Sequence, residues 1–276
     1  MDLRDNPRDE RRAGLWTGLL ILFIMVAGVV SFIVAEHRWW LQPLASTQGR
    51  VIDEYFNAIL FVTAVAFVAT HLFLAVALVR YGARGRERAA HWHEHLGAEL
   101  TWTIVPGVAF VALGVLGVFT WSRLYSAPPA NAEIVEVTGR QFFWYVRYPS
   151  PDGRFARTDP KFITTANPLG LDPSDPASKT DVVVVNELHL VNGRPVEVRV
   201  RSLDVIHSFF LPNFRVKQDA VPGRPVEIWF TPDEPGAYQI ACAQLCGTGH
   251  YTMRGNVTVE SQDAFDRWLK QQKPTR

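Results

Sequence analysis

The chain has 276 residues and a formal net charge of +1, from 28 Lys and Arg against 27 Asp and Glu. This near-zero charge gives no basis for binding nucleic acid, and the length suits one or two domains. Hydrophobic residues make up 48% of the chain. They are unevenly spread, so the two halves of the chain need separate interpretations.

Three apolar stretches precede residue 125, at about 15–36, 55–81 and 100–124. The first would be about 33 Å long as a helix, which is enough to cross the hydrocarbon core of a bilayer. A cleavable signal peptide is the alternative for this stretch, but its apolar core is longer than a usual signal core and no small-x-small site follows it. The sequence therefore predicts a transmembrane domain of three helices over residues 1–125.

Arginine residues indicate the orientation of these helices. They are frequent before the first stretch and after the second, at Arg4, Arg8, Arg11, Arg12, Arg80, Arg84, Arg86 and Arg88, whereas the connection between the two stretches has only Arg38 and Arg50. Because positive loops stay in the cytoplasm, the amino terminus and the 81–99 connection are predicted there. Three crossings of the inner (plasma) membrane then place residues 126–276 outside, in the periplasm of a Gram-negative cell.

From residue 133 onward the pattern changes to short β-branched or alternating runs with Gly and Pro at their boundaries. The expected strands are 134–137, 142–148, 181–185, 196–200, 226–230, 238–241 and 256–259. So many short strands predict an all-β, antiparallel Greek-key sandwich over residues 126–276. A Pro- and Asp-rich insertion at 149–180 interrupts them. A short C-terminal helix follows, with Ser261 as its cap and Phe265, Trp268 and Leu269 on one face.

The two cysteines of the chain stand in one segment, Cys242-Ala-Gln-Leu-Cys246-Gly-Thr-Gly-His250-Tyr-Thr-Met253. Thiolate, imidazole and thioether ligands together suit copper better than magnesium or calcium, and the glycines favour a loop over a helix. His207 lies in a predicted loop between two strand-like runs, where a sheet could bring it beside the cysteines. Two alternatives stay open from spacing alone, namely a Cys242–Cys246 disulfide and a zinc site of two cysteines and two histidines.

The spacing Cys-x3-Cys-x3-His-x2-Met, preceded by Asp204-Val-Ile-His207-Ser and Val216-Lys-Gln-Asp219-Ala-Val-Pro-Gly-Arg224, resembles subunit II of the haem-copper oxidases. The resemblance covers residues 99–259 and implies a cupredoxin-like domain with a dinuclear CuA centre, in which both cysteines bridge two copper ions. It also implies that His207 and Met253 complete one copper site. His250 and the backbone carbonyl of Gln244 would complete the other. Two transmembrane helices are usual in that family, so the first predicted helix is an addition.

Further expectations about single residues follow from the resemblance. Glu99 matches a glutamate near a proton path into subunit I in some branches of the family, although an acid at a helix end needs no function. Phe142 takes the place of the tryptophan that receives electrons from cytochrome c, and Trp144 is retained, but both could equally belong to the core. Gln244 replaces a glutamate that binds magnesium, so no magnesium site is predicted.

The implied function is electron transfer in a proton-translocating cytochrome c oxidase. The chain would accept electrons from a periplasmic cytochrome c or another donor and pass them to haem in the catalytic subunit I, which reduces dioxygen. It has no Cys-x-x-Cys-His, so no haem is expected in this chain. The expected partners are subunit I, the donor and the lipid bilayer. Alternatives are the matching subunit of a nitric oxide reductase, a membrane-anchored copper carrier, and a β-sandwich held by one disulfide.

Overall fold

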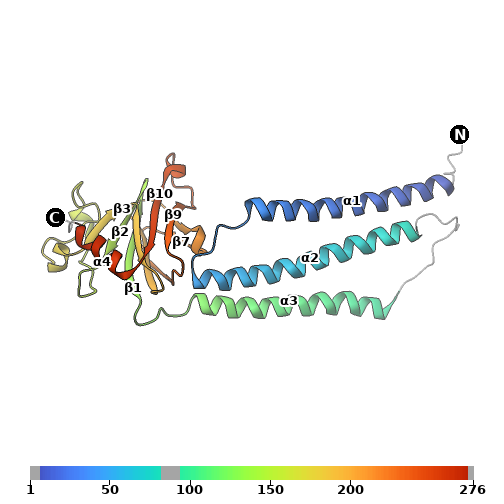
Figure 1. Ribbon diagram of the computed structural model, residues 1–276, viewed down its shortest axis with the longest axis horizontal. Coiled ribbons are helices and arrows are strands. Elements are labelled where there is room, and N and C mark those ends of the chain that lie inside the picture. Colours follow the sequence, from blue (N-terminus) through green and yellow to red (C-terminus); the bar gives the residue numbers. More distant parts are fainter. Residues whose placement is uncertain (1–6, 82–93, 273–276) are drawn as a thin grey trace. The chain divides into compact units, whose positions relative to one another are not determined.

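The computed structural model describes residues 7–81 and 94–272, and it forms two compact units (Figure 1). A helical unit comprises residues 1–40 and 54–119, and a β-rich unit comprises residues 41–53 and 120–276. Arg4, Arg84, Arg86 and Arg88, which contributed to the predicted orientation, lie outside the described residues. Each unit is described separately below.

Three helices of the described chain are long and apolar enough to cross a membrane, namely α1 (Pro7–Trp39), α2 (Thr47–Tyr81) and α3 (Leu96–Leu124). Each begins before the expected apolar stretch, and α1 also ends after it, because helical hydrogen bonding continues into the flanking polar residues. Most of their apolar side chains are exposed on the helix surfaces, as suits a lipid environment.

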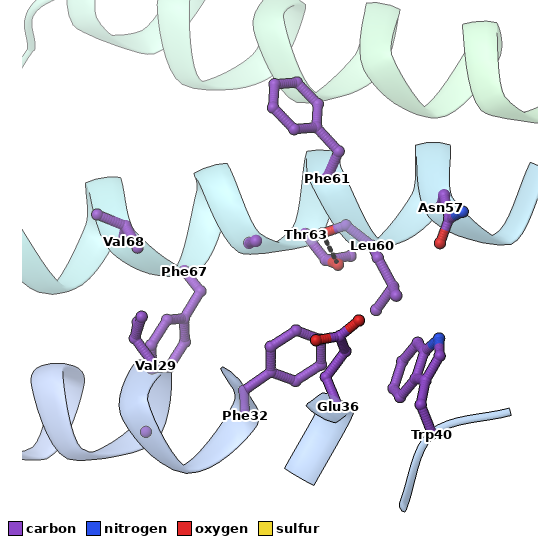
Figure 2. A pocket seen from close by; sticks show the side chains of 12 residues that line it. Val29, Phe32, Glu36, Trp40, Asn57, Leu60, Phe61, Thr63, Phe67 and Val68 are labelled. Carbon is purple, nitrogen blue, oxygen red and sulfur yellow. Dashed lines mark hydrogen bonds between the residues drawn. The ribbon is translucent and has the colours of Figure 1, made fainter. Parts of the chain in front are cut away.

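Small residues allow close contacts within the helical unit. A Cβ atom added to Gly18 of α1 would lie 2.6 Å from Cγ2 of Val79 in α2. The Tyr55 hydroxyl of α2 donates a hydrogen bond to the Leu113 carbonyl of α3 at 3.1 Å. A cavity of about 780 Å³ lies between α1 and α2, with Phe32 and Phe67 on its apolar walls (Figure 2).

The β-rich unit is a sandwich of two five-stranded sheets. The first sheet has the order β3-β2-β1-β5-β8, with β1 (Glu133–Arg140), β2 (Phe143–Tyr148), β3 (Val182–Val185), β5 (Val196–Ser202) and β8 (Val226–Phe230). The second has the order β4-β10-β9-β6-β7, with β4 (Glu187–Val191), β6 (His207–Leu211), β7 (Val216–Ala220), β9 (Gly236–Cys242) and β10 (Arg254–Glu260). The apolar core between them includes Trp144, Phe209 and Phe230.

The sandwich is confirmed, but its strand pairing is not wholly antiparallel as expected. β1 pairs with β5 in parallel, and so does β4 with β10. Parallel neighbours need a crossover connection, which the intervening strands of the sandwich supply here. The described chain also contains β4, β6 and β7, which were not predicted. In β6 most side chains are buried, whatever face they point to, and this removes the alternation that identifies a half-buried strand.

The insertion at 149–180 is ordered by turns and a small core of its own. Two short 3-10 helices, η1 (Pro160–Phe162) and η2 (Pro176–Lys179), are capped by the carboxylates of Asp159 and Asp175. Ala156, Leu169 and Leu171 are buried together. The Asp172 carboxylate accepts hydrogen bonds from the backbone and side chain of Ser174, so these acidic residues stabilise turns.

The chain packs two further segments against the sandwich. The terminal helix α4 (Gln262–Gln271) is capped by Ser261, which accepts a hydrogen bond from Ala264 N at 3.3 Å, and its Trp268 ring stacks on His189 at 3.8 Å. Residues 41–53 form the other segment. There Asp53 accepts two hydrogen bonds of 2.9 Å from the Arg215 guanidinium, a bidentate geometry that fixes the contact.

Candidate metal centre

Strand pairing brings the predicted ligand segments together. His207 is the first residue of β6, so the prediction that it lies in a loop is wrong. β6 pairs with β9 through Phe209 and Cys242, and Cys242 is the last residue of β9. The cysteine loop therefore begins beside the start of β6. It returns to the sheet where Cys242 N donates to the Met253 carbonyl at 3.2 Å, just before β10.

The side chains of this loop and of His207 converge on one point. Cys242 Sγ lies 3.9 Å from Cys246 Sγ and 4.0 Å from Nδ1 of His207. Cys246 Sγ lies 3.7 Å from Nδ1 of His250 and 3.8 Å from Sδ of Met253. The Gln244 carbonyl oxygen is 3.2 Å from Cys242 Sγ, which places a hard oxygen next to the soft donors. All six residues that the resemblance implied thus contribute an atom to one cluster.

Both cysteines are free thiols, and their sulfur atoms are far beyond the bonding distance of about 2.05 Å. Cys246 is buried, and this burial, together with the neighbouring Cys242, raises the pKa of the Cys246 thiol to about 11. The thiol is therefore protonated at neutral pH in the metal-free protein. A metal ion that binds here must displace the proton, which a soft transition metal does readily.

A carboxylate sets the orientation of the His207 ring. Nε2 of His207 lies 2.8 Å from Oδ1 of Asp204, so this nitrogen donates to the carboxylate and Nδ1 faces the sulfur atoms. Burial works against the charge on Asp204. Hydrogen bonds from the Gln141 backbone, His207 and the Val205 backbone outweigh it and hold the pKa of Asp204 below its usual value. The carboxylate is thus ionised at neutral pH.

The two aromatic candidates for electron entry occupy different environments. A Cβ atom added to Gly249 would lie 2.5 Å from Cδ2 of Phe142, so the half-buried Phe142 ring rests directly on the cysteine loop. Trp144 is completely buried, and its ring meets that of His207 at a centroid distance of 6.0 Å. Trp144 is therefore a core residue in contact with His207, whereas Phe142 is only partly buried against the cysteine loop.

Glu99 and Gln244 complete the set of predicted positions. The Glu99 carboxylate accepts a hydrogen bond of 3.0 Å from the His95 backbone at the start of α3, which is a helix-capping contact. Gln244 is exposed, and its backbone carbonyl oxygen lies beside the sulfur of Cys242. Asp204 and Gln141, which hold the ligand segments, were missed as site residues. Asp204 stood in the quoted motif, but no local pattern indicated that it contacts His207.

Fold and cluster define a membrane-anchored protein with a cupredoxin-like domain and a His207–Cys242–Cys246 group that could hold a metal ion. Residues 34–118 match the family model of the cytochrome C oxidase subunit II transmembrane domain, and residues 134–261 match that of its periplasmic domain. The chain belongs to the cytochrome c oxidase subunit II family. It is therefore a membrane-anchored subunit of a haem-copper oxidase, an oxidoreductase complex, with its C-terminal domain in the periplasm.

Two relatives agree with this assignment by sequence. The chain is 38% identical to the alternative cytochrome c oxidase subunit 2 of Bradyrhizobium diazoefficiens, over 92% of this chain and 91% of the relative. It is 30% identical to cytochrome c oxidase subunit 2 of Cereibacter sphaeroides, over 83% of this chain and 78% of the relative. The solved periplasmic domain of subunit II from Bradyrhizobium japonicum is 30% identical and covers 52% of this chain and 95% of its own, with a TM-score of 0.39.

Proposed function

We propose that this subunit carries a dinuclear CuA centre and uses it to transfer electrons. Cys242 and Cys246 would bridge both copper ions. His207 and Met253 would complete one copper site, and His250 with the Gln244 carbonyl the other. The observation that carries the proposal is the convergence of two thiols, two imidazole Nδ1 atoms and one thioether, with successive donor distances of 3.7–4.0 Å. This donor set fits copper better than zinc, which takes no thioether in its usual sites.

The protein environment of the donors suits electron transfer. Bound there, the copper pair would hold one electron at a time. Asp204 keeps the His207 ring in one tautomer and orientation, and the sandwich core encloses His207 and Met253. Ligands held this firmly change little between oxidation states, which lowers the reorganisation that each electron transfer requires. Such burial also argues against a copper carrier, whose site has to stay accessible for exchange.

The subunit would take electrons from a periplasmic donor such as a cytochrome c and deliver them to haem in subunit I, for the reduction of dioxygen. Phe142 is the surface-side candidate for electron entry, and Trp144 would connect it with His207. Glu99 remains a candidate for the entrance of a proton path at the start of α3.

A rapid-mixing experiment on the purified oxidase complex tests this order of electron transfer. Reduced cytochrome c is mixed anaerobically with the oxidised complex, and the copper and haem absorption bands are followed together. We expect the copper band to change first and the haem band to follow. Haem reduction that precedes any change of the copper band would contradict the proposed route.

We also propose that residues 1–125 form a membrane domain with all three helices retained, and that residues 126–276 form the periplasmic domain. Most of α1 precedes the start of the family match at residue 34, so its retention is a separate question. Alkaline phosphatase fused after Glu94 is expected to be inactive, and the same enzyme fused after Gln272 is expected to be active. An active fusion at Glu94, or a mature amino terminus near residue 37, would contradict three retained crossings.

A further inference from the structure

The turn between β1 and β2 contacts both segments that supply the candidate ligands. Nε2 of Gln141 donates a hydrogen bond of 2.5 Å to the carbonyl oxygen of Cys246, 105 residues away in the sequence. The backbone N–H of the same residue donates a hydrogen bond of 2.8 Å to Oδ2 of Asp204, 63 residues away. One residue therefore connects the cysteine loop with the segment before β6.

The second oxygen of Asp204 continues this connection to a candidate ligand. Oδ1 of Asp204 accepts from Nε2 of His207 at 2.8 Å, so Cys246, Gln141, Asp204 and His207 form one continuous chain of hydrogen bonds. The paired residues of β6 and β9 end at Phe209 and Cys242. Cys246 lies beyond this pairing, and the Gln141 side chain reaches the loop there.

The shape of the cysteine loop matches this contact. A Cβ atom added to Gly247 would lie 2.8 Å from Nε2 of Gln141, and Gly247 has φ +133, which favours glycine. A larger residue would push the loop away from the turn. The Gln141 contact thus requires the glycine that follows Cys246, and Phe142 covers the same loop from the next position.

We propose that Gln141 is a positioning residue, which holds the metal-free loop in the geometry that binds metal. Its side chain fixes the Cys246 carbonyl, and its backbone fixes the carboxylate behind His207. A site that is ordered in advance binds its ligand without a separate ordering cost. The identity of the metal rests on the proposed function, but the positioning acts before any metal binds and can be measured without one.

The test uses Gln141→Glu in the full-length, reduced, metal-free protein in detergent. Glutamate keeps the size and the backbone hydrogen bond to Asp204, but it replaces the side-chain donor with a charged acceptor facing the Cys246 carbonyl. Gln239→Glu is the matched control, because Gln239 is exposed on β9. Alkylation of each cysteine by iodoacetamide is followed over time by mass spectrometry, and the unfolding midpoint of each variant is measured alongside.

We expect Cys246 to be alkylated about tenfold faster in Gln141→Glu than in the wild type, since losing one hydrogen bond and adding a repulsive contact shifts local opening by about this factor. Gln239→Glu should behave as the wild type. An unchanged rate at Cys246 would overturn the proposal. So would equal acceleration at both cysteines with a lower unfolding midpoint, because that result indicates a general loss of stability.

A copper-binding measurement on the same proteins distinguishes failure of this proposal from failure of the proposed function. Copper should bind Gln141→Glu about tenfold more slowly than the wild type and give the same final spectrum, because no ligand has changed. A wild type that forms no two-copper centre would refute the proposed function, while the alkylation rates still decide the role of Gln141. Equal copper-binding rates in the wild type and Gln141→Glu would contradict a positioning role for Gln141.

Discussion

Cys242→Ser or Cys246→Ser should each abolish the dinuclear copper centre, whereas Met253→Leu should keep both copper ions and change their midpoint potential. A bridging thiolate contributes to both metal ions, and a serine oxygen is a hard donor that stays protonated at neutral pH. In the proposed centre Met253 would offer one weak thioether to one ion, so its loss would change the electron density there without removing the bridges. His207→Asn should fall between these cases, because it removes a strong ligand from one copper ion only.

Copper stoichiometry, the electron paramagnetic resonance spectrum and the midpoint potential of the four variants measure this gradation. Equal loss of copper from Met253→Leu and Cys242→Ser would contradict the unequal roles. A sandwich held by a disulfide would instead be destabilised by either cysteine substitution and indifferent to Met253. A copper carrier would lose affinity in each variant, and its wild type would show no electron shared between two copper ions.

Arg147→Met should lower the free energy of unfolding of the β-rich unit by about 3–5 kcal/mol, the usual cost of leaving a buried charge without its partner. The guanidinium is 1% exposed and donates to Asp181 at 2.9 Å from Nε, to Glu136 at 3.1 Å and to the Ala156 carbonyl at 2.6 Å. Asp181 is fully buried, so its carboxylate would lose its only ion-pair partner in the described chain.

Arg157→Met is the matched control for this substitution. Arg157 lies in the insertion and pairs with Asp172 at 3.1 Å, but its side chain is 72% exposed, so its loss should cost about 0–1 kcal/mol. Urea unfolding followed by near-ultraviolet circular dichroism gives both values. Similar losses in the two variants would show that the Arg147 cluster contributes no more than a surface ion pair.

Some features of this protein could be predicted because they depend on local sequence. The three apolar helices follow from length and hydrophobicity alone. The Cys242–Met253 segment could be interpreted as a metal-binding loop because its donor residues are close in sequence, and this spacing limits how far apart their side chains can lie. Phe265 and Trp268 share one face of α4, as their spacing predicted, and both pack on Tyr148.

Other features depend on contacts between distant segments and left no local pattern. β7 is an edge strand with polar residues, so its sequence, Val-Lys-Gln-Asp-Ala, does not identify a strand. The parallel pairing of β1 with β5 follows from the path of the whole chain. Asp204 and Gln141 have ordinary neighbours in the sequence, and only the folded chain shows that both contact ligand-bearing segments. The ion pair between Arg147 and Asp181 likewise joins residues on either side of the insertion, so neither residue's local sequence predicts it.

The most direct test of a dinuclear copper centre is electron paramagnetic resonance of the oxidised, purified full-length protein, combined with a count of its metals. We predict two copper ions per chain and a hyperfine pattern from one unpaired electron shared equally by two copper nuclei. One zinc ion per chain, or a spectrum with the electron on a single copper nucleus, would contradict the centre proposed for Cys242, Cys246 and their neighbours.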